Sequence, residues 1–260
     1  MMMTRTRTGI SELDEMLRGG FMTGDSAMIV GSTGTGKTIL GLQYLVNGVT
    51  KFGENGMFVT FEQLPDQICR DANNLGWDLR KIEQEDKFRL VCTSPDLLLE
   101  AHNGEHLLDE PIRQIRPQRI VIDSLSHLEM YVKEGELRKE AYRLIMYLRT
   151  KGLSSLLTWE SHQLTGPTTG LTEKGLSFLV DCIISLRFVE IESSMRKALV
   201  VLKMRGSDHD KRLREFEITS EGIKIGAPFS QYEGIMSGVP RKSWTEETIS
   251  GWTKAFSGKP

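Results

Sequence analysis

Eight consecutive residues carry the side-chain types and the spacing that bind a nucleoside triphosphate. The segment fits the pattern G-x-x-x-x-G-K-[ST] at every position. Its residues are Gly31, Ser32, Thr33, Gly34, Thr35, Gly36, Lys37 and Thr38. Glycines let backbone amides converge on phosphates, while the lysine reaches the β- and γ-phosphate oxygens and the threonine hydroxyl coordinates magnesium. The segment therefore predicts binding of ATP with Mg²⁺, in which Lys37 also has a catalytic role and Thr38 is a metal ligand.

Two carboxylates follow short apolar runs that we expect to be buried strands. Asp123 ends the run over residues 119–122, and we expect it to bind the nucleotide's Mg²⁺, although strands also end in aspartate as a turn signal. Glu62 follows the run over residues 57–61, and a parallel sheet would bring it to the same edge as the phosphates. There it can accept a proton from the attacking water, which makes it a catalytic candidate. The alternative for Glu62 is a solvated residue at a strand end.

Hydrophobic periodicity predicts the elements that position these residues. An apolar run over residues 27–30 precedes the glycine-rich segment, and apolar residues recur at helical spacing from Thr38 to Val49. The elements expected after this helix are strands over residues 57–61, 88–92, 119–122 and 154–158, alternating with helices over residues 65–75, 105–116 and 137–150. Such alternation predicts an α/β fold, in which a mostly parallel sheet has helices on both faces.

The alternating pattern stops beyond Val180. The strands expected over residues 182–191, 198–203 and 213–219 have no helices between them, so they should extend the sheet in antiparallel fashion. Before the core, Ser11 is expected to cap a short helix that ends at Gly19. We therefore expect one domain over residues 1–227.

The remaining residues, 228–260, are expected to form a loop-rich tail. Trp244, Ile249, Trp252 and Phe256 fall on roughly one helical stripe, which is too short for a core of its own. We expect the tail to be an interaction element that packs on its own assembly or binds a partner.

Composition disfavours several functional classes. The 260 residues carry a formal net charge of -2, which argues against a dominant nucleic-acid footprint. No apolar run is long enough to span a bilayer and no secretory pattern is present, so a cytoplasmic protein is expected. Cys69, Cys92 and Cys182 lie far apart and should be reduced and mostly buried. His102 and His106 have the spacing of metal ligands on a helix, but solvated surface is favoured because no third ligand is near.

Taken as a set, the motifs resemble those of a known family. They are TGISELD (8–14), the phosphate-binding segment (31–38), VTFE (59–62), LGWD (75–78), IDSLS (122–126), KMRGS (203–207) and REFEIT (214–219). Single motifs of this kind are common in ATPases, but the set in this order over nearly the whole chain is specific. The chain resembles the KaiC branch of the RecA-like ATPases, most closely the second of the two repeats in that family's clock proteins. The resemblance implies a RecA-like P-loop core that binds and hydrolyses ATP.

The resemblance changes the interpretation of a basic turn at the end of the strand over residues 198–203. By residue type alone, Lys203 and Arg205 favour a solvated turn. In the family, ATP lies between subunits of a ring, and the matching residues reach the γ-phosphate held by the next subunit. The resemblance therefore implies that Lys203 and Arg205 are catalytic in trans, in a ring that we expect to be a hexamer.

Two departures from the family pattern limit what the resemblance implies. The family has two adjacent glutamates where this chain has Glu62 and Gln63, and an amide can orient water but cannot accept its proton. Two adjacent hydroxyl phosphosites correspond to Ser177 and Phe178, so one acceptor remains. We expect Ser177, with Thr172 as a second candidate, to be the phosphoacceptor of a weak autokinase rather than part of a two-site cycle. One repeat also implies a single-tiered ring.

Two functions from different classes remain open. The first is a KaiC-like ATPase with weak self-phosphorylation that acts as a nucleotide-gated signalling or timing switch. The second is a RecA-like DNA-binding motor or recombination accessory. The acidic balance, the lack of a basic groove with interleaved aromatic residues and the lack of a DNA-binding module before the core favour the first. The expected partners are ATP, Mg²⁺, further copies of the chain and a protein bound by the tail, rather than nucleic acid or a membrane.

Overall fold

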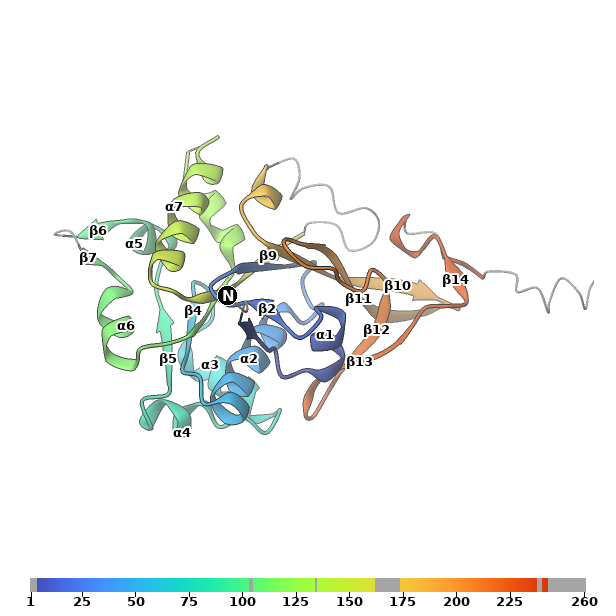
Figure 1. Ribbon diagram of the computed structural model, residues 1–260, viewed down its shortest axis with the longest axis horizontal. Helices are drawn as coiled ribbons and strands as arrows, with labels where there is room; N and C mark the ends of the chain where they lie inside the picture. The colour runs from blue at the N-terminus through green and yellow to red at the C-terminus, as the bar shows by residue number, and fades with distance from the viewer. Residues whose placement is uncertain (1–3, 103–104, 134, 162–173, 238–239, 243–260) are drawn as a thin grey trace, which may run out of the picture.

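A nine-stranded sheet forms the centre of the protein (Figure 1). The structure, a computed structural model, describes residues 4–102, 105–133, 135–161, 174–237 and 240–242. In spatial order the strands are β13 (Gly222–Pro228), β12 (Arg214–Thr219), β11 (Ser194–Met204), β10 (Cys182–Ile191), β3 (Ser26–Gly31), β9 (Ser154–Glu160), β8 (Arg119–Asp123), β4 (Gly56–Thr60) and β5 (Phe88–Cys92). Pairing is parallel from β10 to β5 and antiparallel from β10 to β13. The predicted α/β class with an antiparallel extension is confirmed.

Helices cover both faces of this sheet (Figure 1). One face carries α1 (Ser11–Met16), α2 (Lys37–Asn47), α3 (Pro65–Asn73) and α4 (Leu79–Gln84), and the other carries α5 (Pro95–Leu99), α6 (Asp109–Ile115) and α7 (Leu137–Thr150). Ala27 and Ile29 of β3 belong to the core on the α2 side, while Met28 and Val30 belong to the core on the α7 side. Successive side chains of a strand point to opposite faces, so a strand covered on both faces is apolar throughout.

Short elements connect and border these layers. Three two-stranded ribbons pair β1 (Arg5–Thr6) with β2 (Phe21–Met22), β6 (Ala101–His102) with β7 (Glu105–His106), and β14 (Tyr232–Glu233) with β15 (Arg241–Lys242). Helix α2 continues into a π-helical turn, η1 (Gly48–Phe52), and 3-10 turns form η2 (Leu125–Met130), η3 (Leu176–Phe178) and η4 (Ile235–Ser237). Within the part of the chain that the structure describes, no helix is long and apolar enough to cross a membrane.

Most predicted elements are present, with ends that differ by a few residues. The strand predicted over residues 119–122 extends to Asp123, and the helix predicted over residues 137–150 is α7. Several of the described elements were not predicted, among them β13, α4 and α5. In β13 the buried side chains Ile223 and Ile225 give an alternation too short to predict a strand.

Two local predictions are wrong. Ser11 is the first residue of α1 and caps nothing; instead the Asp14 carboxylate accepts hydrogen bonds from the Thr8 amide (2.7 Å) and hydroxyl (2.8 Å). The helix predicted from residue 105 begins at Asp109, because residues 105–106 pair with residues 101–102 in a hairpin. His102 and His106 therefore lie on strands, and the helical spacing that suggested a metal pair does not exist.

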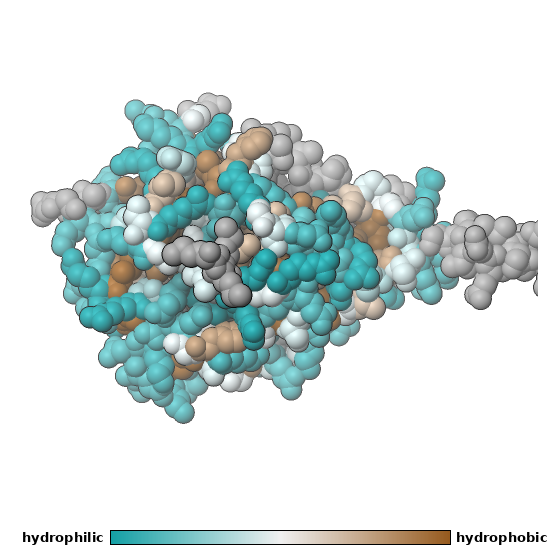
Figure 2. Space-filling model, in the orientation of Figure 1, coloured by the Kyte–Doolittle hydropathy of each residue, from teal (hydrophilic) through white to brown (hydrophobic). Residues whose placement is uncertain are grey.

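Some predictions fall on residues outside the described ranges. These are Thr172 and the tail from residue 243 onward, with its stripe of Trp244, Ile249, Trp252 and Phe256. The part of the tail segment that is described packs on the extended sheet, since buried Ile235 joins Val189 and Ala198 in a small apolar cluster. Figure 2 shows that hydrophobic surface on this face is confined to small areas, one of them near the end where β14 lies. Cys69 and Cys182 are buried, as expected, whereas Cys92 is exposed.

Candidate nucleotide site

The glycine-rich segment forms the loop between β3 and α2, where the sequence placed it. Gly34 and Gly36 have φ angles of +80° and +103°, in the region that favours glycine. A Cβ atom at Gly36 would lie 2.8 Å from Cδ1 of Ile218, on β12, and one at Gly31 would lie 2.7 Å from the Leu186 carbonyl oxygen, on β10. The loop is therefore fixed both by its own dihedral angles and by packing against the antiparallel part of the sheet.

Lys37 lies at the start of α2 with only 9% of its surface exposed. Its Nζ donates a hydrogen bond to the Ser32 carbonyl oxygen at 3.0 Å, so the side chain curls back over the loop. Burial lowers the pKa of Lys37, and the nearby carboxylates Glu160 and Asp123 act in the opposite direction. A buried ammonium in a loop of converging amides is suited to a polyanion, which would offset the cost of its desolvation.

Thr38 and Asp123 come together at the carboxyl edge of the sheet. The Thr38 hydroxyl donates to Asp123 Oδ2 at 2.6 Å, and the Thr158 hydroxyl at the end of β9 donates to Oδ1. The carboxylate is thus held in one orientation by two neighbouring elements. A hydroxyl and a carboxylate are hard oxygen donors of the kind that Mg²⁺ prefers, so this pair fits the predicted metal.

Glu160, which was not among the residues predicted from the sequence, joins the loop. It ends β9, where it lies opposite Gly31 in the parallel register, and its carboxylate accepts a hydrogen bond from the Thr33 hydroxyl. The signal that identified Glu62, an acidic residue at the carboxyl end of a predicted parallel strand, applies equally to Glu160. The predicted strand ended two residues early, at Thr158, and so left Glu160 unassigned.

Glu62 lies at the same edge of the sheet but is open to solvent. Its side chain is 76% exposed, and Oε2 lies 3.5 Å from Nε2 of His127, a residue of η2 that was not predicted from the sequence. His127 Nδ1 is 3.2 Å from the Ser124 carbonyl oxygen, next to Asp123. The imidazole thus links the segments that follow β4 and β8, the two strands whose ends carry Glu62 and Asp123.

A cavity of about 370 Å³ opens beside the loop. Its lining combines loop residues with α3 and β12: Gly34, Gly36, Lys37, Thr38, Ile39, Leu42, Gln63, Ile68, Asp71, Asn74, Leu75 and Ile218. Of the two adjacent residues after β4, Glu62 and Gln63, it is Gln63 that lines this cavity. Apolar side chains with a few polar groups beside a phosphate-binding loop provide the surroundings that a nucleoside requires.

Lys203 and Arg205 lie at the opposite edge of the sheet from the loop. This is the edge at which the parallel strands begin, whereas the loop lies at the carboxyl edge, where they end. Met204 pairs with Cys182, and Cys182 pairs with Ala27 at the beginning of β3, whereas the loop follows the end of β3. The Lys203 ammonium donates to the carbonyl oxygens of Ser177 and Val180, each at 2.6 Å. The two cations are therefore not brought to the loop of their own chain.

Ser177, the candidate phosphoacceptor, belongs to this second cluster. It lies in η3, half-buried, and its carbonyl oxygen is bound by Lys203. Arg205 donates through NH2 to the carbonyl oxygen of the next residue, Phe178, at 2.7 Å. The chain thus places the candidate phosphoacceptor beside the two basic residues and at the edge opposite its own loop.

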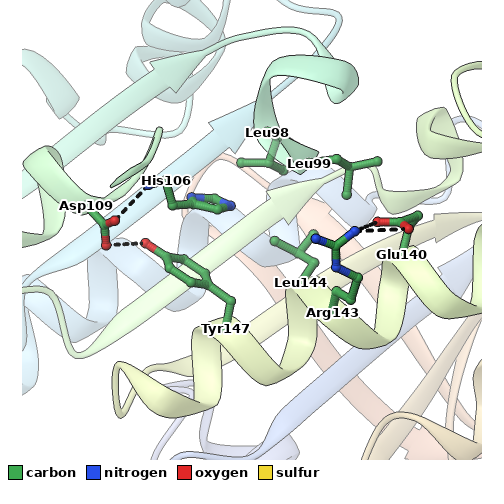
Figure 3. A pocket seen from close by; sticks show the side chains of 8 residues that line it. All are labelled: Leu98, Leu99, His106, Asp109, Glu140, Arg143, Leu144 and Tyr147. Atoms are coloured by element: carbon green, nitrogen blue, oxygen red, sulfur yellow. Dashed lines mark hydrogen bonds and ion pairs between the residues drawn. The ribbon is translucent and has the colours of Figure 1, made fainter. Parts of the chain in front are cut away.

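A second cavity, of about 280 Å³, lies among α5, α6 and α7 (Figure 3). Its polar groups are bonded to one another: the Asp109 carboxylate accepts from the His106 amide (2.8 Å) and the Tyr147 hydroxyl (2.9 Å), and Arg143 pairs with Glu140. Burial lowers the pKa of His106, whose ring stacks on Tyr147. None of the lining residues belongs to the glycine-rich loop, so the cavity beside the loop is the candidate nucleotide site.

Comparisons with known proteins agree with this geometry. A family profile described as "ATPase: KaiC" matches residues 6–230. The circadian clock protein KaiC3 of Synechocystis sp. is 35% identical over 236 residues, which are 91% of this chain and 46% of KaiC3. The circadian clock oscillator protein KaiC of Thermostichus vulcanus is 34% identical over 244 residues, 94% of this chain and 46% of that protein. The chain spans about half the length of the curated relatives it matches.

Proposed function

Because this chain belongs to the KaiC family of ATPases, we propose that it is an ATP-hydrolysing switch whose sites are completed between copies of the chain. The copies form a ring, expected to be a hexamer, in which each ATP lies at a boundary between two subunits. One subunit contributes the loop, and the next contributes Lys203 and Arg205.

The observation that carries the proposal is the separation of the two clusters. The loop follows the end of β3, whereas Lys203 and Arg205 lie at the level of its beginning, through the pairing of Met204 with Cys182. A strand rises about 3.3 Å per residue, so the six residues of β3 separate the two edges by much more than a hydrogen bond. Two basic residues at that edge suit the γ-phosphate of another copy rather than that of their own.

Each residue of the loop edge has a distinct role in the proposed reaction. Loop amides and Lys37 hold the β- and γ-phosphates, while Thr38 and Asp123 hold Mg²⁺, which would neutralise developing charge on the phosphate oxygens. Glu62 accepts a proton from the water whose oxygen bonds to the γ-phosphorus as the bond to ADP breaks. The 76% exposure of Glu62 leaves it free to turn toward that water, and Gln63 orients the water from the cavity wall.

We propose two further features that rest on the second cluster and on the tail. Ser177 accepts a phosphoryl group from the ATP of the neighbouring copy, because Lys203 binds its backbone at the edge that faces that ATP. Residues 1–227 are the ATPase domain, and the tail after residue 227 presents an interaction element to a protein partner. Nucleotide state would then be signalled through the ring to that partner.

Mass measurement in solution with and without ATP and Mg²⁺ tests the proposed function. We expect a closed oligomer with nucleotide, together with phosphate release that depends on protein assembly. A protein that stays monomeric at every concentration while it hydrolyses ATP at full rate would contradict the proposal. Titration with single- and double-stranded DNA separates the alternative, a DNA motor, for which binding should weaken steeply with salt.

A further inference from the structure

Asp181 joins three segments at the edge of the sheet opposite the loop. It lies between η3 and β10, and its side chain is only 10% exposed. Its Oδ2 accepts from the Ser26 amide at the beginning of β3 (3.0 Å) and from Arg149 at the end of α7, while Oδ1 faces Arg205 at 3.5 Å. One buried carboxylate therefore connects the loop-bearing strand, helix α7 and a proposed catalytic arginine.

Arg205 is held mainly through residues 178–181. Its backbone amide donates to the Asp181 carbonyl oxygen at 2.8 Å, and its guanidinium binds the Phe178 carbonyl oxygen and the Asp181 carboxylate. The side chain nevertheless remains 49% exposed, so the guanidinium is oriented without being enclosed. An arginine that is oriented before it meets a phosphate loses less rotamer freedom on binding.

We propose that Asp181 is the positioning residue for Arg205, and that it directs the guanidinium toward the γ-phosphate bound by a neighbouring copy. The inference rests on the proposed function, because it presumes that Arg205 acts in trans. In this proposal Asp181 contacts neither ATP nor the attacking water and acts only by orienting Arg205. The contact with Ser26 also ties Arg205 to the strand that ends in the chain's own loop.

The surrounding charges indicate how large the effect should be. Besides Arg149 and Arg205, the groups around Asp181 include a second carboxylate, Asp25, together with Lys203 and Cys182. Burial, and then the charge of Asp181, raise the pKa of Asp25 to about 6, so Asp25 is ionised at neutral pH. With a neutral residue at position 181, Arg205 would still be attracted by the negative charge of Asp25. That carboxylate, however, would not hold the guanidinium in the position that Asp181 gives it. The arginine should then be misdirected rather than lost, and the loss of rate should be smaller than on removal of Arg205.

Asp181→Asn tests the proposal because the amide oxygen can still accept from the Ser26 amide while the negative charge is lost. We expect kcat to fall about tenfold, as for loss of one charge-assisted contact, with KM for ATP and ring assembly unchanged. The unchanged KM is expected because the loop that binds ATP is untouched. Asp181→Glu keeps the charge with one added methylene, and its kcat should lie between those of wild type and Asp181→Asn.

Asp109→Asn is the matched control. Asp109 is a largely buried carboxylate that pairs at 2.6 Å with Lys151, a basic residue at the end of α7 as Arg149 is. Asp109, however, lines the cavity among α5, α6 and α7, away from Arg205. Its replacement should affect stability in the same way and leave kcat unchanged. If both variants lower kcat equally, the effect of Asp181→Asn is a general loss of stability and the proposal is overturned.

Single-turnover phosphate release in the Arg205→Ala background decides whether Asp181 acts through Arg205. We expect Asp181→Asn to cause no further loss there, because the group that it positions is gone. An equal loss in both backgrounds overturns the positioning role and leaves the proposed function intact. Arg205→Ala rings that turn over at the wild-type rate would instead contradict the trans function itself. If Asp181→Asn does not fold, Asp181→Glu decides: a lower kcat at constant KM supports the proposal, and an unchanged kcat overturns it.

Discussion

The two edges of the central sheet carry functional groups of opposite character. At the carboxyl edge, Lys37 is 9% exposed and Asp123 is held by two hydroxyl groups. At the opposite edge, Arg205 is 49% exposed and its guanidinium binds a backbone carbonyl and one carboxylate. At the first edge Lys37 is enclosed by its own chain, whereas at the second edge Arg205 is oriented but still open to solvent.

Under the proposed function, this difference would explain how a single chain holds both halves of one site without completing it. Two complementary surfaces on opposite sides of a subunit form a head-to-tail contact, and such contacts close into rings when the rotation permits. An arginine that must reach another subunit cannot be buried beforehand, while the loop that grips the phosphates benefits from being fixed. The experiments below test whether the two edges act on the same ATP.

The largest effect is expected from removing Arg205. A cation that meets the γ-phosphate in the transition state is worth about three to five orders of magnitude in rate, so Arg205→Ala should bind ATP and assemble but hardly turn over. Lys37→Ala should fail mainly at binding phosphate. In rings that mix the two variants, some boundaries pair the intact loop of an Arg205→Ala subunit with the intact Arg205 of a Lys37→Ala subunit. Phosphate release should recover at these boundaries.

The mixing experiment requires proof that subunits exchange. Native mass spectrometry of two differently labelled mutants provides this proof, and each mutant alone sets the baseline. Mixed rings whose activity does not exceed the sum of the separate mutants would show that the two edges serve different molecules of ATP or none.

A second, smaller effect is expected from Glu62→Gln at the carboxyl edge. The loop, Lys37 and the metal ligands are unchanged, so nucleotide affinity should stay as it is, while hydrolysis slows by roughly 100-fold through loss of the general base. Equilibrium titration with a fluorescent ATP analogue and steady-state phosphate release measure the two quantities separately. Undiminished turnover would assign the activation of water to another group.

Phosphorylation of Ser177, which lies at the edge of the sheet opposite the loop, is expected to be minor. After incubation with ATP and Mg²⁺, mass spectrometry of the peptide that holds Thr172 and Ser177 should locate phosphate on Ser177 in a fraction of the chains. Lys37→Ala should abolish it, because the loop no longer binds the donor. Phosphate on Thr172 alone would contradict the assignment, and an unmodified peptide would leave an ATPase without kinase activity.

The smallest effect is expected on the free energy of unfolding, through the carboxyl group of Asp25 at the edge that carries Arg205. The pKa of Asp25 is raised to about 6, chiefly by burial and then by Asp181, so the folded protein binds this proton more tightly than the unfolded chain. Stability must therefore fall as pH rises through about 6. Asp25→Asn removes that cost and, because the group is partly exposed, should raise the unfolding temperature by only about 2 °C at pH 7.5.

The gain from Asp25→Asn should vanish near pH 3, below the ordinary aspartate pKa of 3.8, where the wild-type carboxyl is protonated in both states. Thermal unfolding at the two pH values measures it, with Asp66→Asn as control because that carboxylate is 84% exposed. An equal shift at both pH values would show that the change acts through packing rather than through charge.

The sequence predicted most of the fold because the signals are local. Strand β3 is apolar throughout and precedes a contiguous motif, so both the strand and the loop could be located. β13 was missed because its buried residues alternate over too short a stretch, and Glu160 was missed because its strand was ended early. The helix predicted from residue 105 starts late for a different reason: a hairpin, which depends on pairing between separated residues, takes up residues 105–106.

The sequence by itself determined that the chain carries the complete phosphate-binding motif at residues 31–38, since its glycines, lysine and threonine lie within one short segment. Only the tertiary structure decided which edge of the sheet receives Lys203, Arg205 and Ser177. That choice depends on the direction in which β10 pairs with β3 and β11 pairs with β10, and pairing between distant strands leaves no local signal in either strand. The same dependence hid Asp181, whose three partners come from β3, α7 and the segment after β11 and meet only when the sheet has formed.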